Sequence, residues 1–586
     1  MGKNTNEQSG RQRVVIIFVI LFAGIAAATW AWLYLSGSSS ILPATPGGVV
    51  FEQLFPPETS VVISVNPSDE AEQARHRNLM KLIFKNKERG VIPVLVSQLT
   101  KKKELPEELV GLLGMQTRFA LGVWPEESEN MADLNAKFSL AFSVEDAALA
   151  RGVLEGLKVD GKVARDPKIT KNIYFVPGLV SNDYEVGLIA DVIFITNGGS
   201  EMANEIITRY QKSGNSFAKN ELFKKAFSKY SPPFTGYAFV NVSDGVLSKD
   251  LKFEDLIGEA ADAQLLVIRA EEDGFKFERT TLLPQRKGNK DGGKIAAFKV
   301  LNPASGTIKV PMEANLMRYE GSGLADYVSG SGATAAQIET QLRALTGLNF
   351  EADIAPFFNG DFVFVVRDVT SILPDFALYV DASGQAGKAR EFVEKMAMKV
   401  DQLVMIANMT LNPPKNDEEA MAPVEEKLPV ISQEKIDFSG LTGRRITISL
   451  SNISESILKL PLLNLFKQDI HLSYAVTADE IFVISTSPVD GLALGNVANT
   501  ERSDLYTSLK SKIRIEGPVF FVDAEAVKKY LTKVVGIVDG VSPLSADRKI
   551  TFDAIVEYIS PIKGFMQISK QGGDEVYEEG FLKIGE

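Results

Sequence analysis

The sequence of 586 residues contains no cysteine and only two histidines. Without cysteine there is no disulfide framework, thiolate metal site, iron–sulfur cluster or cysteine nucleophile. The histidines, His76 and His471, leave little material for a catalytic triad, a zinc site or a histidine general base. The sequence also lacks a Gly-x-Ser-x-Gly motif and a calcium-binding loop motif. We therefore expect no catalytic residue, no cofactor, no metal and no enzymatic activity.

An excess of basic residues is absent as well, which excludes a nucleic-acid partner. Lys and Arg number 63 against 75 Asp and Glu, so the net charge is −12. That is the wrong sign for a protein held by phosphate contacts. Hydrophobic residues make up 45% of the chain and charged residues 24%, an ordinary globular composition. A chain this long exceeds a single domain of about 150 residues, so two or more domains are expected.

Only one long hydrophobic run occurs, at residues 14–35. As a helix its 22 residues would reach about 33 Å, enough for a hydrocarbon core of about 30 Å. Aromatic residues gather at its C-terminal end, where they suit the headgroup layer. The run predicts a single transmembrane helix that binds the lipid bilayer through Val14, Phe18, Phe22, Trp30, Trp32, Tyr34 and Leu35.

The basic residues near this run lie on one side of it: Lys3, Arg11 and Arg13 precede it. By the positive-inside rule, residues 1–13 are cytoplasmic and the bulk of the chain is outside the cell membrane. A cleaved signal peptide is the alternative, because residues 26–28 are alanines, but the run is longer than a usual signal. Without residues 1–35 the chain keeps 60 basic and 74 acidic residues, a net charge of −14. A part of the chain with this charge is repelled by anionic lipid headgroups, so a peripheral mode in which it lies along the membrane surface is disfavoured.

The rest of the chain divides by composition into a tether at 36–49, a first lobe at 50–284, a linker at 285–295 and a second lobe at 296–586. A Pro-rich acidic stretch at 411–429 predicts a flexible insertion in the second lobe. Short apolar strands alternate with hairpin turns and amphipathic helices. The pattern predicts an α+β fold, with two lobes of mainly antiparallel sheet and helices packed on one face.

Five sequence blocks recur in the same order in the two lobes, which indicates an internal duplication. In the first lobe they are 118–124, 137–143, 191–196, 236–242 and a hairpin at Asp273. In the second lobe they are 360–367, 375–381, 479–484, 517–523 and a hairpin at 564–573. The spacing between paired blocks varies, so the copies have diverged and acquired insertions.

Two segments resemble a family of bacterial proteins. The segment PPETSVVISVNP at 56–67 follows the predicted anchor, and residues 215–244 combine an aromatic helix with an aromatic strand that ends near Asn or Asp. In these features and in layout the chain is similar to the bacterial domain of unknown function 3352 family. The resemblance implies a single-pass, envelope-exposed protein. It implies no activity and brings no functional residues with it.

Other local motifs favour ordinary structure over chemistry. The segment Gly321–Asp326 has two glycines of a dinucleotide loop but not the third, so a turn is expected. His76 stands between two arginines and is expected to be solvated, whereas His471 begins an alternating strand and is expected at an edge or in a core. The acidic residues 271–273 are expected in a solvated hairpin turn.

Three functions remain open from the sequence. The first is a non-enzymatic scaffold or interaction module that binds other envelope proteins, in an unknown oligomeric state. The second is a binding protein for an apolar ligand or lipid held between sheet and helices, in a cavity lined by Phe138, Phe194, Phe223, Phe227 and Phe239. Those aromatics fit an ordinary core better. The third, an enzyme that uses two carboxylates, needs a cleft that a sequence cannot reveal.

Overall fold

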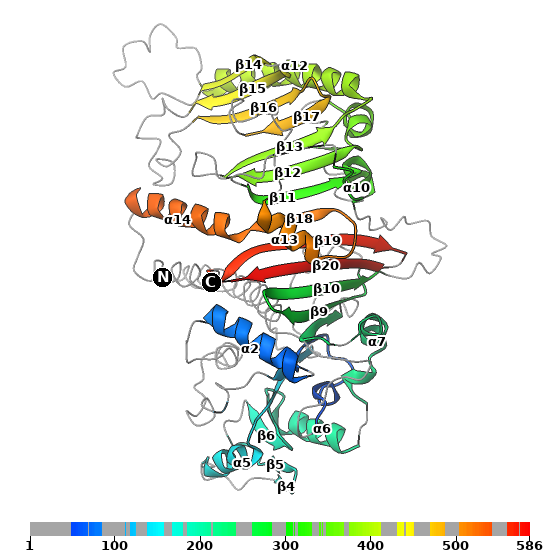
Figure 1. The fold of residues 1–586 in the computed structure, drawn as a ribbon, viewed down its shortest axis with the longest axis vertical. Coiled ribbons are helices and arrows are strands. Elements are labelled where there is room, and N and C mark those ends of the chain that lie inside the picture. The colour runs from blue at the N-terminus through cyan, green and yellow to red at the C-terminus, as the bar shows by residue number, and fades with distance from the viewer. Residues whose placement is uncertain are drawn as a thin grey trace, which may run out of the picture. The chain divides into compact units, whose positions relative to one another are not determined.

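Antiparallel strands and packed helices make up the computed structural model of the chain, which is therefore an α+β protein (Figure 1). The structure describes residues 48–67, 69–84, 112, 118–124, 137–157, 167–179, 184–212, 215–231, 233–241, 261–283, 301–306, 308, 310, 315–330, 339–340, 343, 347–367, 374–411, 430–438, 441–449, 469–486, 503–541, 560–573 and 575–585. The chain forms two compact units. Unit 1 comprises Met1–Lys287, Gly572–Glu578 and Glu586, and unit 2 comprises Gly288–Gln571 and Glu579–Gly585.

The described residues of unit 1 form ten strands, most of them rich in the β-branched or aromatic residues that suit a pleated surface. They are β1 Val61–Val65, β2 Phe119–Trp124, β3 Lys137–Ser143, β4 Lys168–Ile169, β5 Ile173–Phe175, β6 Glu185–Ile189, β7 Val192–Thr196, β8 Gly236–Asn241, β9 Ala263–Glu271 and β10 Gly274–Leu282. Hydrogen bonding places them in the order β4-β5-β6-β7-β3-β2-β1-β8-β9-β10, with every neighbouring pair antiparallel.

The helices of unit 1 cover a core made largely of aromatic side chains. They are η1 Phe51–Gln53, α2 Glu70–Phe84, α5 Ala147–Gly156, α6 Gly199–Lys212, η2 Phe217–Lys219 and α7 Glu221–Phe227. The ring of Phe223 lies 5.1 Å from that of Phe227 and 5.5 Å from that of Phe239, centroid to centroid. At these separations aromatic rings contact one another directly. The core leaves no space between these rings for a ligand.

The core of unit 1 begins one residue earlier than the sequence indicated. Val49, expected at the end of the flexible tether, is only 1% exposed and belongs to the hydrophobic cluster of unit 1. A branched apolar side chain next to the buried helix η1 gains more from burial than from solvation. The buried cluster of unit 1 therefore includes the residue that immediately precedes the predicted first lobe.

Ten strands are likewise formed by the part of unit 2 that the structure describes. They are β11 Asn315–Ser322, β12 Asp361–Arg367, β13 Asp375–Asp381, β14 Val430–Phe438, β15 Leu441–Ser449, β16 Ile470–Val476, β17 Ile481–Ser485, β18 Val519–Asp523, β19 Ile562–Gly572 and β20 Glu575–Ile584, of which residues 579–584 count with this unit. They are hydrogen bonded in the order β14-β15-β16-β17-β13-β12-β11-β18-β19-β20. Its helices are α10 Leu324–Gly330, η3 Phe350–Ile354, η4 Ala355–Phe357, α12 Ala386–Leu411, α13 Asp504–Lys512 and α14 Ala524–Val541.

The strand order is the same in the two units. If the strands of each unit are numbered along the chain, both sheets have the order 4-5-6-7-3-2-1-8-9-10. The five paired sequence blocks fall on equivalent strands: β2 and β12, β3 and β13, β7 and β17, β8 and β18, and the closing hairpins β9–β10 and β19–β20. Local hairpins alone would not produce the same strand order twice, because the central strands of each sheet pair with strands that are distant in the sequence.

Equivalent helices also begin with equivalent caps. In unit 1 the Asn220 side chain accepts a hydrogen bond from the Phe223 amide at 3.0 Å, at the start of α7. In unit 2 the Ser503 hydroxyl accepts one from the Tyr506 amide at 3.1 Å, at the start of α13. Each cap satisfies an amide that would otherwise lack a partner in the first turn. The same local chemistry therefore precedes the strands β8 and β18.

Candidate functional site

The described residues of unit 2 form a small charged pocket where α13, β19 and β20 meet the junction of β18 and α14. Its volume is about 430 Å³, and its lining residues are Asp504, Leu505, Ser508, Asp523, Glu525, Lys563 and Lys583. Helix α13 turns its apolar face into the core, where Tyr506 and Leu509 are buried. The opposite face of α13 therefore presents its polar side chains to the pocket.

Most charges in this pocket are held by neighbours. The Asp523 carboxylate accepts a hydrogen bond from the Ala526 amide at 2.9 Å and so caps the first turn of α14. Lys563 Nζ lies 2.7 Å from Glu525 Oε1, and this hydrogen bond lowers the pKa of Glu525. Lys583 Nζ donates to the Ser508 hydroxyl at 2.8 Å. Paired in this way, the groups resemble a structural network more than a general acid and base.

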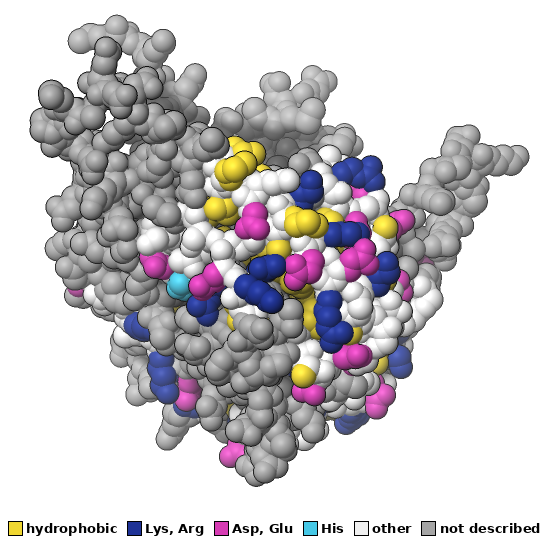
Figure 2. Space-filling model, turned by 90° about the horizontal axis from the view of Figure 1, so that it is seen from above, with side chains coloured by type: hydrophobic (Ala, Val, Ile, Leu, Met, Phe, Trp, Pro, Cys, Tyr) yellow, Lys and Arg dark blue, Asp and Glu magenta, His cyan; other side chains and the backbone are white. Residues whose placement is uncertain are grey.

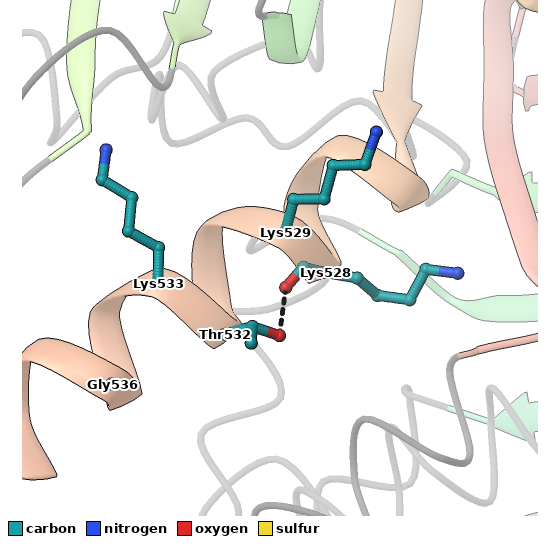
Figure 3. Close-up of a pocket in the computed structure, with 5 residues that line it drawn as sticks. All are labelled: Lys528, Lys529, Thr532, Lys533 and Gly536. Atoms are coloured by element: carbon teal, nitrogen blue, oxygen red, sulfur yellow. Dashed lines mark hydrogen bonds between the residues drawn. The ribbon is translucent and has the colours of Figure 1, made fainter.

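Beside the pocket, lysines line an open groove along α14. The groove has a volume of about 590 Å³ and is bounded by Lys528, Lys529, Thr532, Lys533 and Gly536. Figure 3 shows Lys529 and Lys533 projecting from one side of the helix and Lys528 from another. Thr532 Oγ1 donates to the Lys528 carbonyl at 2.9 Å, and Lys528 Nζ donates to the Ser560 carbonyl at 2.7 Å. Partial burial lowers the pKa of Lys528.

Three lysines thus lie within two turns of one helix, and the ammonium group of Lys528 is already bound to the Ser560 carbonyl. Within the part of the chain that the structure describes, no group of three or more Asp, Glu or His side chains could hold a metal ion. Helix α14 was not among the elements predicted from the sequence. The sequence does carry a pattern that predicts this helix, since Val527, Leu531, Val534 and Val535 alternate with lysines at helical spacing.

Unit 1 contains a second polar cluster, which joins α2 to β8 and β9. The Glu72 carboxylate is 1% exposed and accepts hydrogen bonds from the Thr235 hydroxyl at 2.8 Å and from the Ala270 amide at 3.1 Å. Arg75 forms an ion pair with Glu72 and donates to the Ala270 carbonyl at 3.1 Å. Since every contact joins backbone or side chains of the fold, the cluster fixes the position of α2.

His76, next to this cluster, is completely buried, so the prediction that it is solvated is wrong. Its burial, with a smaller contribution from Arg77, lowers its pKa from 6.5 to about 4. Charged neighbours in sequence point to other sides of α2, whereas His76 shares a helical stripe with Leu79, Met80 and Ile83. Solvation was expected from the flanking charges alone, and helical geometry overrides them here.

A carboxyl group is also buried beside a phenol at the start of unit 1. Glu52 on η1 is 1% exposed, and its Oε1 accepts a hydrogen bond from the Tyr237 hydroxyl at 2.6 Å. Burial raises the pKa of Glu52, although the hydrogen bond from Tyr237 opposes part of the shift. Burial and the neighbouring Glu52 raise the pKa of Tyr237 well above its usual value. The pair is enclosed by the core and tethers η1 to β8.

The other motifs lie where ordinary structure requires them. Gly321 and Ser322 end β11, Gly323 has a φ of +78° and α10 begins at Leu324, so the glycine pair makes a strand-to-helix turn. His471 on β16 is partly exposed, and its Nδ1 lies 3.1 Å from the Thr447 hydroxyl on β15. The five phenylalanines proposed to line a cavity are buried in strands and helices: Phe138, Phe194, Phe223, Phe227 and Phe239.

The residues predicted to form the membrane anchor lie outside the described part of the chain. They are Val14, Phe18, Phe22, Trp30, Trp32, Tyr34 and Leu35, together with the topology determinants Lys3, Arg11 and Arg13. Among the helices that the structure does describe, none combines the length and the apolar character that a membrane crossing requires.

Comparisons with known proteins add little. No family model matches the chain, and no curated protein matches it. Crystal forms I and III of the protein TP0453 share 14% and 15% sequence identity with the chain, and each covers 41% of it. These matches span 81% and 83% of the TP0453 chains, at a TM-score of 0.23 in both cases. A likeness of this size carries no argument about fold or function.

Proposed function

We propose that the protein is an interaction module of the bacterial envelope, non-enzymatic and anchored in the cell membrane by one helix. The anchor is the run at 14–35, with residues 1–13 in the cytoplasm and the two units outside. The resemblance to the domain of unknown function 3352 family supports this address. Charges held in structural pairs, rather than directed at an open cleft, support a role in binding.

The observation that carries this proposal is the exposed apolar end of α12. The first turns of this helix bury Phe392, Val393 and Ala397 against the sheet. Farther along, Met398 is 60% exposed and Met405 is 58% exposed. The exposed large apolar side chains of this region, here called the α12 tail, are Met398, Leu403, Met405 and Ile406. Neighbouring exposed apolar side chains mark sites of protein interaction, and flexible methionines adapt to a partner.

The surroundings of the α12 tail also suit a protein partner. Exposed Lys399 and Asp401 lie between the apolar residues of the tail in the sequence, and the face drawn in Figure 2 likewise mixes apolar, basic and acidic side chains. Protein interfaces commonly combine an apolar centre with a polar rim. Three of the buried phenylalanines, Phe223, Phe227 and Phe239, pack ring against ring, so they give no support to a cavity for an apolar ligand.

We also propose that the two units arose by duplication of one ancestral domain. The identical strand order and the equivalent caps at α7 and α13 support this history. Unit 1 has no exposed helix tail equivalent to that of α12 among its described residues, because α5 ends at Gly156 after ten residues. Duplication followed by extension of one helix would give unit 2 a binding surface of its own.

The absence of native cysteine makes the topology directly testable. Ser9→Cys and Ser228→Cys variants of the full chain place single thiols before the anchor and at the exposed end of α7. In intact cells a membrane-impermeant maleimide should label position 228 and should label position 9 only after the cells are lysed. Labelling of position 9 in intact cells would reverse the orientation. Release of the whole protein by alkaline carbonate would refute the anchor.

The interaction is tested by photo-crosslinking in the native cell. A benzophenone amino acid at Met405 should give a discrete adduct with another envelope protein, and the same group at Lys388 should not. Both positions are exposed and lie on α12, so local concentration is matched. A Met405→Glu substitution should abolish recovery of that partner, because a charge opposes burial of the surface. Equal adducts from both positions would contradict a role for the α12 tail.

A further inference from the structure

Strand β14 is the outermost strand of the sheet in unit 2, and among the described strands it is paired only with β15 (Figure 1). In an antiparallel pair every second residue directs its N–H and C=O away from the neighbouring strand. The described residues 432–435 form no backbone hydrogen bond besides the ladder with β15. Two of these four residues therefore present their peptide groups to the outer side of the sheet, where a further strand can pair with them.

The equivalent strand of unit 1 is protected from such pairing by its length. Strand β4 holds the same place at the end of its sheet, but it consists of two residues, whereas β14 consists of nine. Very short edge strands are one of the means by which proteins prevent unwanted pairing. Since the two units share a strand order, the shared fold does not dictate the long edge strand of unit 2.

Helix α12 runs across the strands of unit 2 and continues beyond β14. Glu394 forms an ion pair with Arg444 of β15, with 3.0 Å between Oε2 and Nη2. Farther along, the Gln433 side chain of β14 donates to the Ala397 carbonyl at 3.1 Å and to Asp401 Oδ1 at 2.7 Å. The helix therefore passes from β15 to β14 between residues 394 and 401. Neighbouring strands lie about 4.8 Å apart and a helix rises about 1.5 Å per residue, so the turns after Asp401 reach past the outer side of β14.

The side of α12 that faces the sheet remains apolar where it passes β14. Val393, Ala397 and Val400 are buried on this side. Leu403 follows Val400 by three residues and so lies on the same side, yet it is 43% exposed, against 8% for Val400. Val404, four residues after Val400, is half-buried. A leucine thus occupies a sheet-facing position beyond the last described strand, and a strand added to β14 would cover it.

We propose that β14 accepts an extended segment of the partner protein as an additional strand, which Leu403 and Val404 contact from the α12 side. Gln433 points toward α12, so its neighbours Ser432 and Glu434, both exposed, lie on the opposite side of the sheet. The bound segment therefore has alternating side chains, apolar toward α12 and polar on the side of Ser432 and Glu434. This inference rests on the proposed interaction at the α12 tail, and it names the part of the partner that is bound.

The position of α12 favours an extended segment over a second copy of the chain. The side of β14 that Leu403 would face in a second copy is already covered by that copy's own α12, through the contacts of Gln433. Pairing of two β14 strands would bring both α12 helices to one side of the joined sheet. A segment without a helix of its own leaves that side open to Leu403.

The test is site-specific photo-crosslinking of the full chain in the native cell, with the attached partner residue identified by mass spectrometry. A benzophenone amino acid is placed at Ser432 or at Glu434. Because residues on one side of a strand alternate, we expect the two adducts to lie in one partner segment, two residues from each other. Phe376 is the control position: it is exposed on β13, which is paired with β12 and β17, so it should give no adduct with that segment.

Two charge substitutions on α12 separate the added strand from other contacts of this helix. Leu403→Glu places a charge on the side that the strand would cover, so the yield of adducts from position 432 should fall about fivefold or more. Gln402→Glu adds the same charge on another side of the helix and should change the yield less than about twofold. Both positions are exposed, so circular dichroism should show an unchanged fold in both variants. Equal losses in the two variants would contradict coverage by Leu403.

The spacing and the origin of the adducts decide between the remaining outcomes. Adducts three or four residues apart would overturn the proposal in favour of a bound helix. Adducts with β14 of a second copy would overturn it in favour of pairing between copies. If Met405 gives its adduct while Ser432 and Glu434 give none, the added strand is refuted and the interaction at the α12 tail stands. If none of the three positions gives an adduct with another protein, the proposed function fails as well.

Discussion

Two fully buried titratable side chains, His76 and Glu52, make the stability of unit 1 depend on pH. They act in opposite directions, because a buried histidine resists gaining a proton and a buried carboxyl group resists losing one. Neither lies in an open site. Their titration therefore reports on folding rather than on chemistry.

His76 should destabilise the protein in mild acid. Its folded pKa of about 4 lies below the unfolded value of 6.5, so the unfolded chain takes up the proton first. The stability is complete above pH 6.5 and is lost as the pH falls toward 4. Between pH 7 and pH 5 the expected loss is about 2 kcal/mol. Urea unfolding of the wild type and of His76→Gln at both pH values measures it.

His471→Gln is the control for that experiment, because His471 is partly exposed on β16. The stability that this variant loses between pH 7 and pH 5 is compared with the loss in His76→Gln. If His76→Gln lost as much stability on acidification as the wild type, the neutral buried state of His76 would be contradicted.

Glu52 should weaken the fold as the pH rises. Burial raises its folded pKa above 4.5, so its contribution is complete below pH 4.5 and is lost as the pH rises through the folded pKa. Glu52→Gln keeps an oxygen acceptor for Tyr237 but cannot ionise. We expect its thermal midpoint, relative to wild type, to be higher at pH 8 than at pH 5. Tyr237→Phe, which removes the donor, should instead cost about 1–3 kcal/mol.

The position of His76 shows what local sequence can and cannot predict. Flanking arginines suggested solvation, but the helical period places His76 three residues before Leu79 and seven before Ile83. Periodicity was therefore the better guide. The Glu52–Tyr237 hydrogen bond, in contrast, joins residues 185 positions apart, and no local pattern reveals such a pair.

Among the secondary-structure elements, β12 directly follows a position, Gly360, that tolerates only glycine. A Cβ added at Gly360 would lie 2.0 Å from the Asp381 carbonyl oxygen of the neighbouring strand β13. Backbone cannot yield as a flexible side chain can, so Gly360→Ala should destabilise unit 2 by about 1–3 kcal/mol. A lowered thermal midpoint for unit 2 would confirm this expectation.

Gly152 in α5 is the matched control, because nothing lies within 4 Å of its added Cβ. Gly152→Ala should stabilise the protein by up to about 1 kcal/mol, since alanine is the better helix former. If both substitutions had the same sign, close approach at Gly360 would not be the cause.

Most elements could be predicted from the sequence, because strands and helices carry clear periods of two and of about 3.6. The strands at 119–124, 137–143 and 192–196 lie within one residue of the predicted blocks 118–124, 137–143 and 191–196. The hairpin β14–β15 and helix α14 were not predicted. In α14 the alternation of valine and lysine fits an amphipathic helix, but how far each of its sides is covered depends on tertiary packing.

For the whole molecule, unit 1 is built from both ends of the chain. Residues 575–578 at the start of β20 count with unit 1, where Tyr577 donates to Glu278 at 2.7 Å and Glu578 forms an ion pair with Arg279. Lys229 forms an ion pair with Glu575. Composition located the linker near residue 290, but it gave no sign that the last strand serves the first unit.

Truncation should therefore affect a distant region. Removal of residues 572–586 should lower the urea midpoint of unit 1, because its β10 side loses these contacts. Trp124 is buried in unit 1 and is the only tryptophan beyond the anchor run, so in a Trp30→Phe/Trp32→Phe background its fluorescence follows unit 1 alone. Removal of residues 579–586 only, which spares 575–578, should change that midpoint less. Equal midpoints for all three chains would contradict the assignment.

The shared last strand also sets a delay during synthesis. About 290 residues separate Leu282, at the end of β10, from Gly572. At roughly 5–20 residues per second, they take about 15–60 s to emerge. Throughout that time the side of β10 that β20 will meet is an open strand edge, the kind of surface that recruits other chains into aggregates. A newly made chain is thus most vulnerable between the synthesis of β10 and that of residues 575–578, which end the vulnerable period.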